Sequence, residues 1–302
     1  MVPFIELPRL DLGFVVIDAF GVLVVIACIV GLYSSKRRAA RVGLDPEEAH
    51  TMALWLILGS FTVAHIVAMV FYFPDRLLDN PWEIFFIWAP ISSLGGFLGA
   101  LITSLVYTRV RKLPFLAYAD VFVWGIVAAW VFGRMGCSFA HDHPGSRSDF
   151  FLAVQYPGGA RHDLGFYEFL FTLLLLYPLT RWLGRKPRPD GFFLALVPLL
   201  YAPVRFGFDF LRSTDYGNVD PRYLGLTAAQ WLCIVMFFGA GWALIRVMRH
   251  GRVRTWSETA RGAEPGEGAC SAGRGGSQDR DQSGDRGGGE QGDGKAAAGS
   301  SD

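Results

Sequence analysis

Seven long stretches of apolar residues recur between positions 1 and 250 of the chain. They cover approximately residues 13–33, 50–73, 86–108, 115–137, 165–183, 191–211 and 226–248. A helix of about 20 residues spans about 30 Å, the thickness of the hydrocarbon core of a bilayer. Because backbone polar groups in lipid must pair within the chain, apolar runs of this length indicate helices. The pattern predicts an all-α, polytopic membrane protein with about seven transmembrane helices.

The polar positions between these runs predict an orientation. Lysine and arginine follow every second run, in clusters at residues 36–41, 109–112, 181–188 and 249–254, and are fewer in the alternate loops. Since basic residues mark cytoplasmic loops, we expect the N-terminus outside and the C-terminus inside. Acidic residues precede the first run and no small-residue cleavage site is visible, so this run is expected to be a retained helix.

The composition changes abruptly at Gly251. Gly, Ser, Asp, Glu and Arg dominate residues 251–302, and no apolar period remains there. Such a segment cannot bury enough apolar area to offset the entropy lost on ordering. We therefore expect a seven-helix membrane domain at residues 1–250 and a disordered cytoplasmic tail at residues 251–302.

The composition of the whole chain indicates which kinds of molecule the protein is expected to bind. Its 302 residues are 52% hydrophobic and 18% charged, which is too apolar for an ordinary soluble domain. The net charge of +1 gives no indication of a nucleic acid, and none is expected. The four cysteines (Cys28, Cys137, Cys233 and Cys270) lie far apart and show neither a disulfide framework nor a zinc-binding spacing. No metal and no cofactor are expected.

The most unusual polar cluster lies at the end of the fourth run. Arg134 follows directly on this apolar stretch, and His141, Asp142 and His143 come within the next nine residues. A guanidinium is costly to desolvate near lipid, so such an arginine usually faces the bundle interior with an anionic partner. Its fork of donors suits phosphate or carboxylate. The alternative is an interfacial arginine that reaches to the lipid headgroups.

A second polar stripe lies at the end of the sixth run. Arg205 and Asp209 are four residues apart and share a helix face, which Tyr201 precedes and Arg212 continues. One interpretation is a structural salt bridge. The other is an anion site in which Asp209 holds the arginines in place.

Three further features, which together include five residues, are candidates for the same site. Asp120, early in the fourth run, needs a partner, and the arginines are the obvious candidates; alternatively it is hydrated near the inner interface. Gly95 and Gly96 lie in a stretch of small residues, which favours close helix packing and also allows a lipid headgroup to approach the backbone. His162 and Glu168, around the start of the fifth run, are a weak polar signal.

These elements, in this order, resemble the prolipoprotein diacylglyceryl transferases, a family of bacterial inner-membrane enzymes. The resemblance spans residues 12–248. The family's Gly-Arg-x-Gly-Asn signature matches Gly133 to Cys137, with Asp142 and Gly145 at the later acidic and glycine positions. Its Tyr-Arg-acidic-Arg helix matches the second stripe.

Weaker correspondences complete the resemblance. They are Asp120, the trio His162, Tyr167 and Glu168, and the pair Gly225 and Gln230. The chain departs from the family pattern at three positions, where Leu94 stands for a histidine, Cys137 for an asparagine and Asp142 for a glutamate. It also has two histidines, His141 and His143, where the family usually has none.

The resemblance implies transfer of a diacylglyceryl group from phosphatidylglycerol to the lipobox cysteine of lipoprotein signal peptides. It implies a multi-pass protein of the bacterial inner membrane with its active site toward the periplasm. Arg134 and Arg205 would bind the phosphate, Asp209 with Arg212 would orient them, and Tyr201 would donate to an oxygen. His141 or His143 would act as base, oriented by Asp142. Asp120, Gly95, Gly96 and Gly145 are further substrate-binding candidates. A non-catalytic member that binds anionic lipid or signal peptides remains the alternative.

Overall fold

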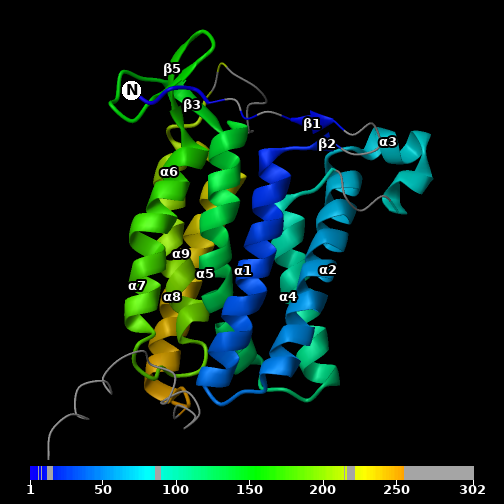
Figure 1. Cartoon of the computed structure of the whole chain (residues 1–302), viewed down its shortest axis with the longest axis vertical. Coiled ribbons are helices and arrows are strands. Elements are labelled where there is room, and N and C mark those ends of the chain that lie inside the picture. Colours follow the sequence, from blue (N-terminus) through cyan, green and yellow to red (C-terminus); the bar gives the residue numbers. More distant parts are fainter. Residues whose placement is uncertain are drawn as a thin grey trace, which may run out of the picture. The chain divides into compact units, whose positions relative to one another are not determined.

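The chain folds into a helical bundle with small β-structures at one end (Figure 1). The computed structural model describes residues 1–5, 7, 9–11, 16–85, 90–213, 215 and 222–254. All of them lie within one compact unit, Met1–Ala263. Most of the expected tail, residues 255–302, lies outside the described residues. The described residues Gly251–Arg254 contact the loop before helix α8, where Nε of Arg254 lies 2.9 Å from Oδ1 of Asp190.

Each of the seven apolar runs contains helical residues. The long ones are α1 (Ala19–Arg41), α2 (Pro46–Phe71), α4 (Ser93–Val110), α5 (Phe115–Ala140), α8 (Phe192–Asp209) and α9 (Ala228–His250). The fifth run forms α6 (Leu164–Phe171), a π-helical turn η2 (Thr172–Leu176) and α7 (Tyr177–Leu183). Short helices α3 (Pro74–Asp79) and η1 (Pro81–Phe85) follow α2. Among the described residues, five helices (α1, α2, α5, α8 and α9) are long and apolar enough to cross a membrane.

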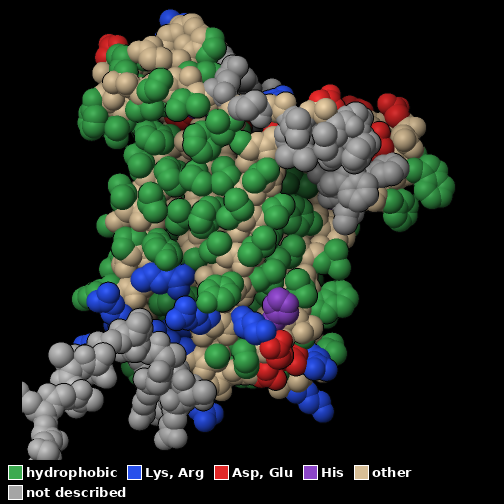
Figure 2. Space-filling model, viewed as in Figure 1, with side chains coloured by type: hydrophobic (Ala, Val, Ile, Leu, Met, Phe, Trp, Pro, Cys, Tyr) green, Lys and Arg blue, Asp and Glu red, His purple; other side chains and the backbone are tan. Residues whose placement is uncertain are grey.

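The outside of the bundle is apolar, as a lipid-facing surface requires. Figure 2 shows apolar side chains over the middle of one face and basic side chains gathered at the end where α1 finishes. Large apolar side chains on α1, α4 and α9 are exposed, including Ile29, Phe97 and Phe238. Burial in lipid would remove this area from water, so the prediction of a helical membrane protein is confirmed at this level.

Close helix pairs build the bundle. Helix α1 packs on α5, α2 on α4 and α8 on α9, and in Figure 1 α1 lies between α5 and the α2–α4 pair. A Cβ on Gly99 would lie 2.6 Å from the carbonyl oxygen of Gly59, and one on Gly95 would lie 2.8 Å from Cα of Ala64. The close packing expected of this small-residue stretch is confirmed.

Asp120 has a structural partner that the sequence did not indicate. Its side chain is buried and its Oδ1 accepts hydrogen bonds from the backbone N–H groups of Phe193 at 2.5 Å and Leu194 at 2.9 Å. These are orphan donors at the start of α8, where the N-cap residue is Gly191 and supplies no side-chain cap. Asp120 therefore caps a neighbouring helix, which corrects the expectation that it is simply hydrated near the inner interface.

Short strands depart from the all-α prediction. Strands β3 (Pro144–Arg147), β5 (Gly159–Asp163) and β4 (Val154–Tyr156) form a three-stranded antiparallel sheet between α5 and α6. Two-residue strands form the pairs β1 (Leu10–Asp11) with β2 (Val16–Ile17), and β6 (Arg222–Tyr223) with β7 (Leu226–Thr227). Strands of two to five residues are too short to show a period of two in the sequence, so the pattern missed them.

Gly145 lies where this sheet contacts the segment that follows α8. Its backbone bridges to Arg212, and a Cβ there would lie 2.6 Å from the carbonyl oxygen of Leu211 and 2.7 Å from Cβ of His162.

We expect Gly145→Ala to lower the free energy of unfolding by about 1–3 kcal/mol, because backbone atoms must shift. Thermal unfolding in detergent measures this. The control is Gly239→Ala on α9, where a Cβ meets nothing within 4 Å, and equal losses in both variants would contradict the close approach.

An ion pair ties the sheet to the segment after α8. Arg161 on β5 is buried and donates to both oxygens of Asp215, at 2.9 and 2.8 Å. The hydrogen bonds from Arg161, and then that from Ser213, hold the pKa of the Asp215 carboxyl well below its usual range.

This pairing predicts a pH dependence of stability. Because the folded pKa of Asp215 lies below the unfolded value of about 3.9, its contribution is complete above that pH and is lost as pH falls through the folded pKa. The melting temperatures of the protein and of Asp215→Asn should therefore differ at pH 7 and converge in strong acid. A constant difference across this range would show that the carboxylate charge is not responsible.

Candidate active site

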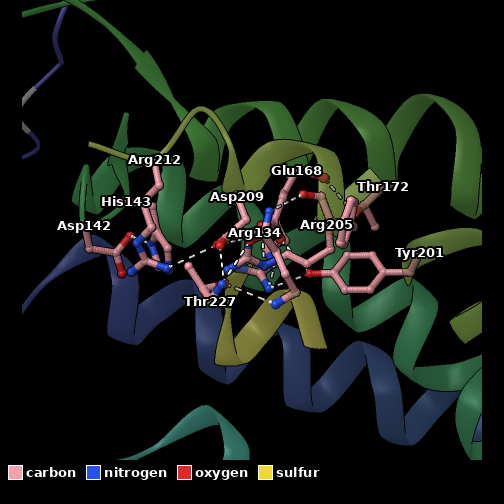
Figure 3. Close-up of polar contacts among 12 residues, drawn as sticks. Arg134, Asp142, His143, Glu168, Thr172, Tyr201, Arg205, Asp209, Arg212 and Thr227 are labelled. Atoms are coloured by element: carbon pink, nitrogen blue, oxygen red, sulfur yellow. Dashed lines mark hydrogen bonds and ion pairs between the residues drawn. The ribbon is translucent and has the colours of Figure 1, made fainter. Parts of the chain in front are cut away.

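The polar residues of three helices converge near one end of the bundle (Figure 3). Arg134 comes from the last turns of α5, and Glu168 comes from α6. Tyr201, Arg205 and Asp209 succeed one another at four-residue intervals along α8 and so share one face of it. The helix contacts of α5 with α6 and α8 bring the three sets together.

Glu168 lies at the centre of this cluster. Its Oε2 is 2.9 Å from Nη2 of Arg134 and accepts a hydrogen bond of 2.8 Å from the hydroxyl of Tyr201. Its Oε1 is 3.6 Å from Nε of Arg205. The carboxylate is 1% exposed, so it is held by these partners and not by water. One buried anion therefore brings two arginines from distant parts of the chain side by side.

Asp209 fixes the second arginine from the other side. Its Oδ1 is 3.0 Å from Nη1 of Arg205 and 3.7 Å from Nη1 of Arg212. The hydroxyl of Thr227 donates to its Oδ2. Thr227 is also the N-cap of α9 and forms a capping box with Gln230, which is buried. The ion pairing predicted from the four-residue spacing is confirmed, and α9 supports it.

Arg134 keeps a donor available. Among the described residues its buried Nε has no hydrogen-bond partner. Its guanidinium lies 5.8 Å from the ring centre of Trp130, which also packs 4.6 Å from the ring of Tyr201. A cation whose buried Nε–H has no partner is suited to donate a hydrogen bond to an oxygen of an anionic ligand.

The two histidines have different environments. Nδ1 of His141 is 2.7 Å from Oδ2 of Asp163, to which Tyr156 also donates at 2.9 Å. The His141 ring stacks on Phe4 at 4.0 Å, and its buried Nε2 has no partner among the described residues. This ring is therefore enclosed.

His143 is the more accessible histidine. Its Nδ1 is hydrogen-bonded to Asp142, and its side chain is 29% exposed. The sequence left open which histidine Asp142 orients, and the structure pairs it with His143. In Figure 3 the pair lies at one edge of the cluster and Tyr201 at the opposite edge.

Three of the other candidates lie away from the cluster. Asp120 is fourteen residues before Arg134 (134 − 120) on the same helix, which separates them by about 21 Å along α5. Gly95 and Gly96 lie in the first turn of α4, which packs on α2. Gly145 is close by, because it joins β3 to Arg212, but its contacts are those of packing and of backbone hydrogen bonding within the fold.

Three residues of this region were missed or undervalued from the sequence. Glu168 was only a weak signal, although a carboxylate among apolar residues of a membrane helix usually has a functional partner. Thr227 precedes an apolar run with Gln230 three residues later, which is the signature of a capping box. Asp163 gave no signal, because its partner His141 lies in another segment.

Comparison with known proteins identifies the family. The family model for prolipoprotein diacylglyceryl transferase matches residues 9–246. The chain belongs to the prolipoprotein diacylglyceryl transferase family. The matched range contains every residue of the polar cluster.

Individual relatives agree with this assignment. The chain is 29% identical over 234 residues to the phosphatidylglycerol–prolipoprotein diacylglyceryl transferase of Chromohalobacter salexigens, covering 76% of this chain and 85% of the relative. It is 29% identical over 250 residues to the enzyme of that name from Methylobacillus flagellatus, covering 80% and 95%. The similarity therefore extends over most of both chains.

This chain departs from the expected family pattern in two parts of the structure, on α4 and at the end of α5. Leu94 is exposed on the outside of α4 and makes no polar contribution. Cys137 is three residues after Arg134 on α5, and its sulfur lies within 4.8 Å of ligand atoms of Asp142 and His143. The second group of departures is thus adjacent to the arginine cluster.

Proposed function

We propose that this protein transfers a diacylglyceryl group from phosphatidylglycerol to the cysteine thiol of lipoprotein precursors. The sulfur of the cysteine forms a C–S bond to the glycerol carbon, and the C–O bond between that carbon and the phosphate breaks. The electron pair of this bond stays on the phosphate oxygen, so glycerol phosphate leaves and a thioether remains. The thiol proton must pass to an acceptor, because the thiolate is the nucleophile.

The pairing of Arg134 and Arg205 through Glu168 is the observation that carries this proposal. Negative charge grows on the departing phosphate, and fixed cationic donors in a water-poor site stabilise such charge strongly. Arg134 has a buried donor without a partner among the described residues, while Arg205 is held by Asp209. Both guanidinium groups are thus positioned before the substrate arrives, and neither can lose its charge at neutral pH.

Tyr201 has a different role from the one expected. Its hydroxyl proton is donated to Glu168, and its oxygen accepts from Nη2 of Arg134 at 3.2 Å. We therefore assign Tyr201 to positioning the arginine and the carboxylate, in place of donation to the phosphate.

His143 is the histidine best placed to act on the substrate thiol. Both ring nitrogens of His141 are enclosed, whereas the His143 side chain is partly exposed and oriented by Asp142. Cys137 is on the same side of α5 as Arg134, since they are three residues apart. A thiol that meets His143 would therefore approach the phosphate held by the arginines.

The proposed location is the bacterial inner membrane, with seven spans, the N-terminus outside and the site toward the periplasm. The basic clusters after α1, α4, α7 and α9 support this orientation, because they mark cytoplasmic ends. The α5 end with Arg134 would then be the periplasmic end, where both phosphatidylglycerol and the precursor signal peptide are available.

Cysteine labelling tests this orientation. In a variant that retains Cys137 and lacks the other three cysteines, a cysteine introduced at Ser148 should add labelling by an impermeant reagent applied to intact spheroplasts. A cysteine at Arg188 should react only after permeabilisation. The reverse pattern would refute the proposed topology.

Complementation tests the activity in cells. Expression of this protein in bacteria depleted of their own transferase should restore lipoprotein maturation and growth. An Arg134→Gln variant expressed at the same level in the membrane is the matched control and should not. Accumulation of unmodified precursors despite correct insertion of the unmutated protein would speak against transfer.

A further inference from the structure

Cys137, Asp142 and His143 bring three different ligand types to one place. The sulfur, a carboxylate oxygen and an imidazole nitrogen all lie within 4.8 Å of one another. Two ligands on one tetrahedral zinc ion, at 2.0–2.3 Å from it, are about 3.5 Å apart. Side-chain adjustments of about 1 Å would therefore bring the three atoms onto one ion.

The backbone holds these ligands firmly. Cys137 lies in the last turn of α5, where its carbonyl oxygen accepts the His141 N–H at 3.1 Å and the left-handed conformation of His141 turns the chain back. The carbonyl of His143 accepts the N–H of Leu164 at 3.1 Å. A Cβ on Gly165 would lie 3.0 Å from the Cys137 carbonyl carbon, so α6 packs closely on this turn.

One side of the group is open. The side chains of Asp142 and His143 are 43% and 29% exposed. Catalytic zinc sites have three protein ligands and a fourth position for water or substrate, whereas structural sites are closed by four. The chain supplies three ligands and an accessible side, which is the pattern of a catalytic site.

We propose that Cys137, Asp142 and His143 bind a zinc ion whose fourth ligand is the thiol of the substrate cysteine. This deepens the transfer reaction proposed above and rests on it. On coordination the substrate thiol releases its proton to water, because a zinc-bound thiol is deprotonated. The zinc-bound thiolate then attacks the glycerol carbon, the C–O bond to the phosphate breaks with its electron pair on oxygen, and water replaces the thioether on the metal.

The charges of the site favour this arrangement. Zinc with one thiolate, one carboxylate and a neutral imidazole has no net charge, and the substrate thiolate makes the complex anionic. Arg134, three residues before Cys137 on the same helix face, lies next to this anion and to the phosphate. The nucleophile and the leaving group would thus share one set of cationic donors.

Metal content tests the ligands. The protein purified in detergent and exposed to micromolar zinc should hold about one zinc ion per chain. Cys137→Ser and His143→Ala should each weaken zinc affinity more than the 10–100-fold that is typical of loss of an outer-shell partner. Cys28→Ser, a substitution at another helix cysteine, is the control and should bind as the unmutated protein does. No zinc in the unmutated protein, or equal affinity in Cys137→Ser, would overturn the site.

Cobalt substitution tests the fourth ligand without any mutation. Addition of a lipobox peptide to the cobalt-loaded protein should increase the thiolate-to-cobalt charge-transfer absorption, as one thiolate becomes two. The same peptide with serine in place of cysteine should leave the spectrum unchanged. An unchanged spectrum with the bound cysteine peptide would show that its thiol does not reach the metal.

Metal removal separates this inference from the proposed function. Chelation should abolish transfer, and readdition of zinc should restore it. Full transfer by metal-free protein would overturn the zinc role and leave the transferase proposal standing, and its loss in His143→Ala would then make His143 the base. A peptide-dependent cobalt spectrum in a protein that transfers nothing would support the metal site and overturn the transferase proposal.

Discussion

Arg134→Gln should lower the rate of diacylglyceryl transfer about 10²–10³-fold, the loss typical of removing one donor to a developing anion. Gln keeps much of the length of the side chain and removes the charge that faces the phosphate. The effect should appear mainly in kcat for labelled phosphatidylglycerol and a lipobox peptide, because the charge on the phosphate oxygen increases as the C–O bond breaks.

Two further variants make this prediction specific. Arg134→Lys should recover little of the loss, because it retains the charge without the planar fork that meets both Glu168 and the ligand. Arg37→Gln replaces an arginine at the opposite end of the bundle, which donates a hydrogen bond to the hydroxyl of Tyr33, and this variant should transfer normally. Transfer by folded Arg134→Gln at the unmutated rate would remove the arginine from the mechanism.

Glu168→Gln should destabilise the protein by about 3 kcal/mol. The substitution preserves the shape of a side chain that is 1% exposed, but it leaves the partly buried guanidinium groups of Arg134 and Arg205 without their shared carboxylate. Breaking a buried ion pair costs about 3–5 kcal/mol, and the lower figure applies because Arg205 retains Asp209. Chemical unfolding in detergent micelles measures the change, and transfer at low temperature should also fall.

The matched control for this charge removal is Glu47→Gln. Glu47 pairs with Lys36 at 2.7 Å, yet its side chain is 72% exposed, so its loss should change the free energy of unfolding by less than about 1 kcal/mol. Equal stability of Glu168→Gln and the unmutated protein would show that the central carboxylate does not hold the arginines.

The long helices could be predicted because the pattern for them is local. The apolar run at residues 115–137 corresponds to the observed helix Phe115–Ala140, and the run at 191–211 corresponds to Phe192–Asp209. A lipid-spanning helix needs only a continuous apolar stretch, so its sequence signal is local. Strand β5 could not be predicted in this way. Its pairing with β3 depends on contacts between segments and on the space that Gly145 leaves, neither of which has a sequence period.

The candidate site was predictable to the extent that its residues share a helix. Arg205 and Asp209 are one turn apart, so their ion pair follows from spacing. Glu168 reaches Arg134 only through the packing of α6 on α5, which the sequence does not encode locally. The contacts of Asp120 could not be predicted either. Its hydrogen-bond donors are backbone N–H groups of α8, which no residue type reveals.

Transfer by the purified protein in vitro tests the central claim most directly. The protein in phosphatidylglycerol vesicles is incubated with a peptide that carries a lipobox cysteine, and the products are analysed by mass spectrometry. We expect the peptide to gain one diacylglyceryl group as a thioether, with an equal amount of glycerol phosphate released, and the serine peptide to remain unchanged. Binding of lipid and peptide without any thioether product, in every lipid composition, would contradict the account and leave a protein that only binds these ligands.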